Sequence, residues 1–127
     1  NPLPLRDALP GEQGVELVLV MAAIAIKHRA DSWIYELRSA AVQNGVFVGA
    51  VNKGGLERVE ADRLFSGRSV IIDPFGEILA EGPPDVGNVA VPATIDLGQV
   101  EAHGHRYHYM RDRRPEIYDL LTRITHV

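Results

Sequence analysis

Apolar residues along this chain gather in short continuous runs and one helical stripe. Residues 15–20 and 46–51 are runs rich in β-branched residues, which predict strands buried on both faces. Between them, apolar positions at helical spacing predict a crossover helix with Asp31 as its N-cap and Asn44-Gly45 at its end. The apolar stripe of this helix consists of Trp33, Ile34, Leu37, Ala40 and Ala41. A strand–helix–strand order of this kind predicts two parallel strands.

The second half of the chain predicts further strands and a less regular connection. Residues 69–72 and 77–81 are expected to be strands joined by Asp73-Pro74-Phe75-Gly76, whose residue types suit a type I turn. Residues 54–66 are mixed and charged, and predict a loop. Residues 88–96 alternate like a strand, and Pro92 would place that strand at an edge or a bulge.

Helices are few in relation to the strands. Short helical segments are expected around residues 5–9 and 97–102, and a last helix over residues 115–124. The pattern therefore predicts one α/β domain over residues 1–127, with a mixed sheet of about five strands and two or three convincing helices. Because so few helices cannot cover both faces of the sheet, we expect part of it to meet a missing N-terminal half or a partner subunit.

Charge and composition narrow the function classes. The net charge of −4 over 127 residues gives no reason to expect nucleic acid or an anionic membrane as a partner. The longest apolar stretch, residues 15–26, contains Glu16 and is too short to cross a bilayer, so we expect a cytoplasmic protein. The chain has no cysteine, which excludes disulfides, thiolate metal sites and a thiol nucleophile within it.

Several local motifs occur in an order that resembles the second half of the carbon–nitrogen hydrolase (nitrilase/amidase) family. They are Gly14-Val-Glu-Leu-Val-Leu-Val20, Trp33 with Arg38 and Asn44-Gly45, Asn52-x-x-Gly55-x-Glu57, Phe65-x-Gly67-x-Ser69, Asp73-Pro74-x-Gly76-Glu-Ile-Leu-Ala, and Arg111-Asp-Arg113-Arg114-Pro115-x-x-Tyr118. The last motif is similar to the tail of the N-carbamoyl-amide branch. The resemblance covers almost the whole chain.

This resemblance implies a fold, an activity and a missing part. The family fold is a four-layer α-β-β-α sandwich that usually assembles through dimers, and this chain would supply part of it. Family members hydrolyse non-peptide carbon–nitrogen bonds with a glutamate base, a lysine and a cysteine nucleophile, without a cofactor. The glutamate and lysine belong to the family's first half, and the cysteine would fall just upstream of Asn1. No catalytic residue is therefore assigned in this chain.

Two residues are candidates for the wall of a substrate pocket. Glu57 follows a glycine-rich stretch, and its alternative role is that of a solvated loop carboxylate. Asn52 stands at a strand end, where it would either line the pocket, hold the loop through its side-chain amide or serve as a simple turn residue. Gly55 and Gly67 are expected to provide backbone conformation and not ligand contacts.

The charged tail is the candidate oligomer contact. Its members are Arg111, Asp112, Arg113, Arg114 and Tyr118. The family's tail often contacts the dimer partner, and arginine suits ion pairs across an interface. The alternative is an exposed charge cluster that contributes little energy.

Histidine and serine give weaker signals. His103, His105 and His108 raise the possibility of a metal site, but lone histidines in a surface connection are commoner, and no metal is assigned. Ser69 lacks the Gly-x-Ser-x-Gly turn of a serine nucleophile. A hydrolase with a relocated centre at Ser69 or His105 remains the weakest of three hypotheses.

The two stronger hypotheses differ in what the chain does. In the first, it is the C-terminal part of an amidase, contributing scaffold, pocket wall and oligomer contacts to a complete enzyme that acts on a small amide. In the second, it is an inactive truncated relative that serves as a self-associating binding or assembly module.

Overall fold

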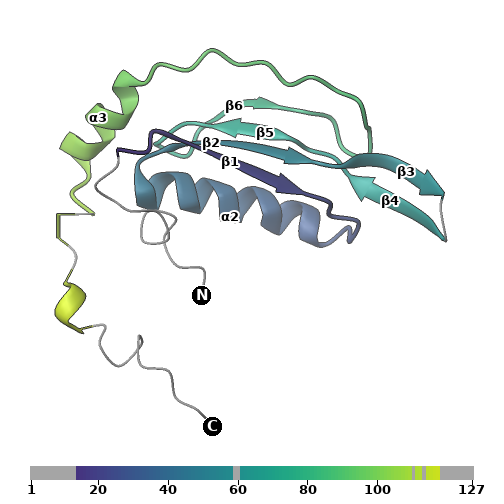
Figure 1. The fold of residues 1–127 in the computed structure, drawn as a ribbon, viewed down its shortest axis with the longest axis horizontal. Coiled ribbons are helices and arrows are strands. Elements are labelled where there is room, and N and C mark those ends of the chain that lie inside the picture. Colours follow the sequence, from purple (N-terminus) through teal and green to yellow (C-terminus); the bar gives the residue numbers. More distant parts are fainter. Residues whose placement is uncertain (1–13, 59–60, 110, 113, 118–127) are drawn as a thin grey trace, which may run out of the picture.

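The computed structural model describes residues 14–58, 61–109, 111–112 and 114–117 (Figure 1). The elements follow one another as β1 (Leu17–Ala22), α2 (Arg29–Asn44), β2 (Phe47–Asn52), β3 (Gly54–Arg58), β4 (Asp62–Ser66), β5 (Val70–Ile72), β6 (Ile78–Glu81), α3 (Gly98–Arg106) and the 3-10 helix η2 (Pro115–Ile117). The helical turn expected around residues 5–9, Arg113 and residues 118–127 lie outside the described residues.

A mixed four-stranded sheet forms the centre of the molecule, with strands in the order β1-β2-β5-β6. β1 and β2 are parallel, in register from Leu17 opposite Phe47 to Ala22 opposite Asn52, and helix α2 connects them. The other two pairings are antiparallel. The predicted α/β class, the mixed sheet and the parallel pair with its crossover helix are therefore confirmed.

The core lies between α2 and one face of this sheet. The helix contributes most of its predicted stripe, because Trp33, Ile34, Leu37 and Ala41 are buried. Inward-facing sheet residues complete the core, namely Val48, Ala50, Val70 and Ile72, with Val18, Val20, Ala22 and Ile78 packed against them. Gly45 ends the helix as predicted, in the left-handed conformation (φ 62°) that glycine adopts without a steric cost.

The predicted start of α2 is wrong. The helix begins at Arg29, and the position before it is His28. Asp31 lies within the first turn, where its carboxylate accepts a hydrogen bond from Arg68 Nη1 at 2.9 Å. A carboxylate in the first turn still interacts favourably with the helix dipole. Asp31 therefore indicated the start of a helix correctly, but it is not the N-cap residue.

The loop predicted over residues 54–66 is also wrong, because these residues form an antiparallel hairpin. Its strands β3 and β4 pair from Gly54 opposite Ser66 to Arg58 opposite Asp62. The hairpin projects past the end of the four-stranded sheet (Figure 1). A two-stranded ribbon in solvent tolerates charged side chains on both faces, so it lacks the apolar alternation that predicts a strand.

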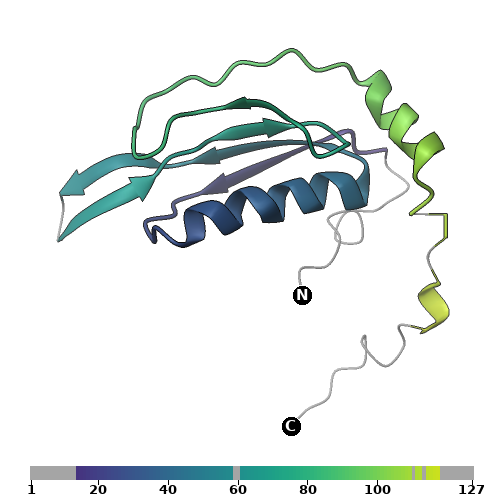
Figure 2. The same ribbon diagram turned by 180° about the vertical axis from the view of Figure 1, so that it is seen from behind.

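A long connection without strands follows β6. Residues 88–96, predicted as an edge strand, contain no strand in the described structure. They run back on the β6 side of the sheet toward α3 (Figures 1 and 2). The alternation of apolar and polar residues did not produce a strand here, because Pro92 lacks the N–H that a paired strand requires. Helix α3 extends the prediction for residues 97–102 to Arg106, and η2 occupies the start of the predicted last helix.

The sheet face opposite α2 exposes apolar side chains. Leu19, Met21 and Val51 have relative exposures of 75%, 89% and 62%. They alternate with the core residues of β1 and β2, and therefore point away from α2. Among the described residues, no helix is long and apolar enough to cross a membrane.

Candidate functional site

The candidate site lies where β1 and β2 end side by side. Ala22 and Asn52 are the last residues of these strands and are register partners. Because the strands are parallel, both carboxyl ends open toward the same edge of the sheet, which is where ligands bind in open α/β sheets. The segments that follow them, Ala23–Lys27 and the β3–β4 hairpin, form this edge.

Asn52 ties three segments together through a buried side chain. Its Oδ1 accepts a hydrogen bond from the Ile24 N–H at 2.9 Å. Its Nδ2 donates to Ser66 Oγ at 3.0 Å and to the Gly67 carbonyl at 2.7 Å. The side-chain amide thus holds the chain after β1 and the end of β4 around the end of β2. This is the loop-holding role that the sequence left open, while a contact of Asn52 with substrate stays a prediction.

Two serine hydroxyls complete this hydrogen-bond network. Ser66 Oγ donates to the Ile24 carbonyl at 3.1 Å, and Ser69 Oγ hydrogen-bonds the backbone N–H of Asn52 at 3.1 Å and its carbonyl at 3.3 Å. Within the described part of the chain, Ser69 Oγ bonds only to Asn52, and no histidine is positioned as its base. Nothing in this geometry favours Ser69 as a nucleophile.

Glycines allow the backbones of the site to approach closely. Gly55 and Gly67 adopt positive φ values of 91° and 61°, which agrees with a conformational role. A Cβ at Gly54 would lie 2.0 Å from the Val86 carbonyl oxygen, so the 85–88 turn packs directly on the base of the hairpin. These contacts fix the position of the hairpin relative to the sheet.

Lys53 is a site residue that the sequence did not single out. It follows β2 directly, and its Nζ lies 2.5 Å from Glu57 Oε2 and 4.3 Å from the centre of the Phe65 ring. The Glu57 side chain is 37% exposed, so the candidate pocket carboxylate is a partly solvated member of an ion pair. The sequence feature that could have identified Lys53 is its position directly after the apolar run of β2.

Arg68 stabilises the surroundings of the site through two hydrogen-bonded carboxylates. Its backbone has a left-handed conformation (φ 58°), which is uncommon for a residue other than glycine. Its Nε donates to Glu81 Oε1 at 2.6 Å, and its Nη1 donates to Asp31 Oδ1 at 2.9 Å. The hydrogen bond to Glu81 is the main cause that raises the pKa of Arg68 above its ordinary value. The guanidinium therefore links α2, the start of β5 and the end of β6.

The charged tail lies apart from this site. Arg111 and Asp112 form an exposed ion pair at 2.7 Å, and Arg114 pairs with Glu116 at 2.7 Å. The hydrogen bond from Arg111 lowers the pKa of Asp112. Arg113 and Tyr118 fall outside the described residues, and the interface role of the tail stays a prediction.

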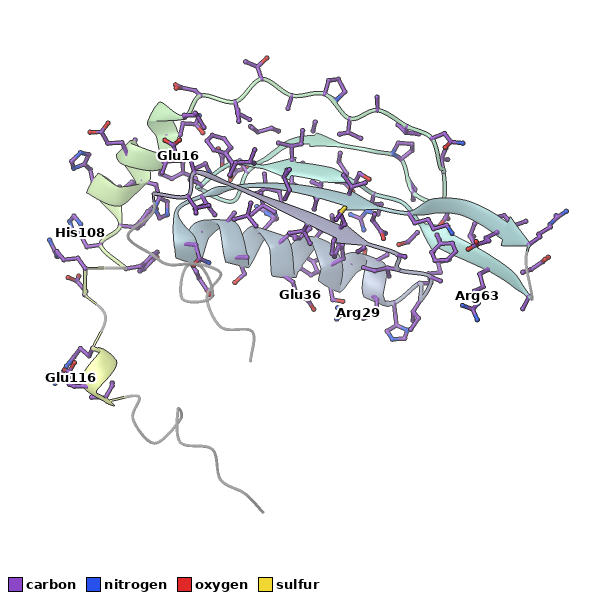
Figure 3. The ribbon with its side chains drawn as sticks, in the orientation of Figure 1. Glu16, Arg29, Glu36, Arg63, His108 and Glu116 are labelled. Atoms are coloured by element: carbon purple, nitrogen blue, oxygen red, sulfur yellow. The ribbon has the colours of Figure 1, made fainter. Side chains whose placement is uncertain are left out.

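Helix α3, which carries His103 and His105, lies at the opposite end of the sheet from the carboxyl ends of β1 and β2 (Figure 1), and His108 follows this helix (Figure 3). His103 is buried and packs its ring against Phe75 and Tyr107 at centroid distances of 5.4 and 5.0 Å. His105 is exposed, 3.5 Å from Glu101. No group of three or more potential ligands among the described residues is arranged to hold a metal ion.

A hollow of about 370 Å³ lies beside His103 and the end of α2, away from the candidate site. We place the site at the strand ends because the polar network and the charged side chains converge there.

The comparisons agree on one family. The carbon-nitrogen hydrolase family model matches residues 8–104. The chain is 30% identical over 120 residues to N-carbamoylputrescine amidase of Arabidopsis thaliana, covering 86% of this chain and 40% of that protein. It is 37% identical over 90 residues to 2-oxoglutaramate amidase of Bacillus subtilis, covering 71% of this chain and 33% of that protein.

A solved structure shows that the fold of this chain also agrees with this family. The chain superposes on the carbon-nitrogen hydrolase of Helicobacter pylori G27 with a TM-score of 0.81 and 27% identity, covering 97% of this chain and 46% of that one. The chain thus spans less than half the length of these relatives. Since the family model matches most of the sequence and the fold is shared, the chain belongs to the carbon–nitrogen hydrolase family.

Proposed function

We propose that this chain is the C-terminal part of an amidase that acts on non-peptide carbon–nitrogen bonds, including those of N-carbamoyl amides. The observation that carries the proposal is the match over residues 8–104 combined with coverage of only 33% to 46% of the relatives' length. The similar curated proteins are amidases by name, among them an (R)-stereoselective amidase of a Pseudomonas species.

In this proposal the chain contributes structure and not the nucleophile. The sheet, α2 and the strand-end network form part of the scaffold, and Asn52 and Glu57 form part of the pocket wall. The thiol that attacks the substrate has to come from outside these 127 residues, because they contain no cysteine. The complete enzyme would be a cytoplasmic homo-oligomer that needs no cofactor, with the charged tail at a subunit contact.

An activity comparison tests this proposal. The purified 127-residue chain should release no ammonia from N-carbamoylputrescine or 2-oxoglutaramate. The same chain, expressed together with the coding region that precedes it, should turn over a small amide. The matched control is that longer protein with its nucleophilic cysteine changed to serine, which should be inactive. Turnover by the 127-residue chain alone would contradict the proposal.

A second function is favoured by the open face of the sheet. Leu19, Met21 and Val51 present apolar surface that a second copy of the chain can cover. The chain would then be an inactive self-associating module for binding or assembly. Light scattering separates the two: a stable oligomer of defined size favours the module, whereas a monomer or an aggregate that requires the upstream half favours the amidase fragment.

A further inference from the structure

One face of the β3–β4 hairpin gathers charged side chains beside an aromatic ring. Gly55 pairs with Phe65 and Glu57 pairs with Arg63 across the ladder, and residues that are directly opposite share a face. Lys53 joins this face through its contacts with Glu57 and Phe65. Because Gly55 has no side chain, the surface between Lys53 and Glu57 carries no bulky group.

This face carries more positive than negative charge. Lys53 and Arg63 supply two cations, and Glu57 supplies the one carboxylate of this set. In the described part of the chain, Arg63 makes no ion pair, and its side chain projects from the hairpin (Figure 3). Among the described residues of the other face, Arg58 and Asp62 are the charged ones, and they lie 3.8 Å apart. A surplus of positive charge favours an anionic ligand on the first face only.

Lys53 is held in place before any ligand arrives. Its backbone N–H donates to the Ala22 carbonyl at 3.0 Å, and its carbonyl accepts from the Gly67 N–H at 3.0 Å. The nearly buried Phe65 ring lies under the ammonium. The Lys53 ammonium has three N–H donors, and one of them donates a hydrogen bond to Glu57 Oε2. A donor group positioned in this way loses less conformational freedom on binding than a mobile lysine would.

We propose that Lys53 and Arg63 bind a carboxylate group on the amide substrate, and that Glu57 occupies the Lys53 ammonium until the ligand displaces it. The Lys53–Glu57 pair is partly exposed, with side-chain exposures of 44% and 37%, and exposed pairs are weak, so the exchange costs little. The inference rests on the proposed function only in choosing an amide as the ligand, and its test requires no turnover.

A binding titration of the whole 127-residue chain tests the inference. Three probes of similar size are compared by NMR at low ionic strength: glutaramate, which carries a carboxylate, the neutral pentanamide and the cationic 5-aminopentanamide. Glutaramate should shift the amide signals of Lys53, Arg63 and Phe65 in a saturable manner. The neutral and cationic probes should bind at least about fivefold more weakly, because they cannot form the charge-assisted hydrogen bonds.

Substitutions assign the effect to particular side chains. Lys53→Met keeps an apolar stem over Phe65 and should weaken glutaramate binding about fivefold to tenfold. Arg63→Gln should weaken it less because, in the described part of the chain, no ring contact or ion pair positions the Arg63 guanidinium as Phe65 positions the Lys53 ammonium. Glu57→Gln removes the competing carboxylate and should tighten binding about twofold to fivefold. Arg58→Met removes a cation from the opposite face and should leave the affinity unchanged.

The results that would overturn the inference differ from those that would overturn the amidase proposal. No saturable binding of glutaramate, equal binding of pentanamide, or equal losses in Lys53→Met and Arg58→Met each contradict it. Preferential binding of 5-aminopentanamide that Glu57→Gln abolishes contradicts it too, since it would make Glu57 the recognition group. The amidase proposal is tested by turnover and is unaffected by any of these outcomes.

Discussion

A single buried amide organises the strand ends of this molecule. Asn52 combines one acceptor and two donors in one short side chain, and its partners are Ile24, Ser66 and Gly67. Only asparagine and glutamine carry two N–H donors on one atom and a carbonyl acceptor on another in a neutral side chain, and the longer glutamine does not fit the same distances. The residue is therefore specified by structure whether or not it also contacts substrate.

Replacing Asn52 by alanine should lower the free energy of unfolding by about 2 to 4 kcal/mol, because it leaves buried hydrogen-bonding groups without partners. Urea denaturation followed by circular dichroism measures the change. Gln43→Ala is the matched control on the exposed side of α2 and should change stability by less than about 0.5 kcal/mol. Similar losses in the two variants would show that the network contributes little.

The sequence identified Asn52 as a candidate site residue, but it did not identify Lys53 or Arg63. A polar residue that ends an apolar run is visible in the sequence, and so Asn52 was a candidate. Lys53 contacts Glu57 from four positions away on the same segment, whereas Arg63 becomes a neighbour of Glu57 only through the hairpin, which the charged composition of residues 54–66 concealed. Pairing across two strands depends on register, and no local pattern in this stretch specifies it.

At the scale of elements, the joint between the hairpin and the 85–88 turn decides how the site is built. Backbone lies directly on backbone there: a Cβ at Gly54 would be 2.0 Å from the Val86 carbonyl oxygen, and one at Gly87 would be 2.5 Å from the Gly54 oxygen. Such an approach leaves no space for a side chain on either segment. The hairpin can keep its orientation only while these positions remain glycine.

Gly54→Ala should therefore destabilise the chain by about 3 kcal/mol or more, since the backbone has to move to relieve the overlap. Gly104 provides the matched control, because it lies inside α3 and a Cβ added there would meet no atom within 4 Å. Gly104→Ala should raise stability by about 0.5 to 1 kcal/mol through helix propensity. Thermal denaturation compares the two, and a Gly54→Ala variant as stable as the parent would refute this account of the joint.

At the scale of the whole molecule, the two faces of the sheet differ in how they are covered. One face is covered by α2, whereas on the other face Leu19 and Met21 are exposed in the part of the chain that the structure describes. Apolar surface of this kind is unusual on a complete monomeric domain and marks a contact. Both proposed functions require this face to be covered, by another part of a longer protein or by a second copy.

Met21→Glu should reduce self-association of the isolated chain, because a carboxylate on the open face has to be desolvated when that face is covered. Size-exclusion chromatography with light scattering measures the shift toward monomer. Tyr35→Glu, on an exposed position of α2, is the matched control and should leave the association unchanged. If Met21→Glu associates as strongly as the parent while Tyr35→Glu does not, the contact lies on the helix side.

The sequence by itself determined the strand–helix–strand unit, the β5–β6 hairpin and its turn, and the family. The strand–helix–strand unit and the hairpin follow from continuous apolar runs, a helical stripe and turn residues, all of which act between near neighbours in the chain. The family was indicated by the resemblance of several short motifs that occur in the family's order. The tertiary structure decided the β3–β4 hairpin, the Asn52 network and the grouping of Lys53, Glu57 and Arg63. The hydrogen bonds of that network join residues 28 and 42 positions apart, and contacts at such separations arise only once the sheet has brought the strand ends together.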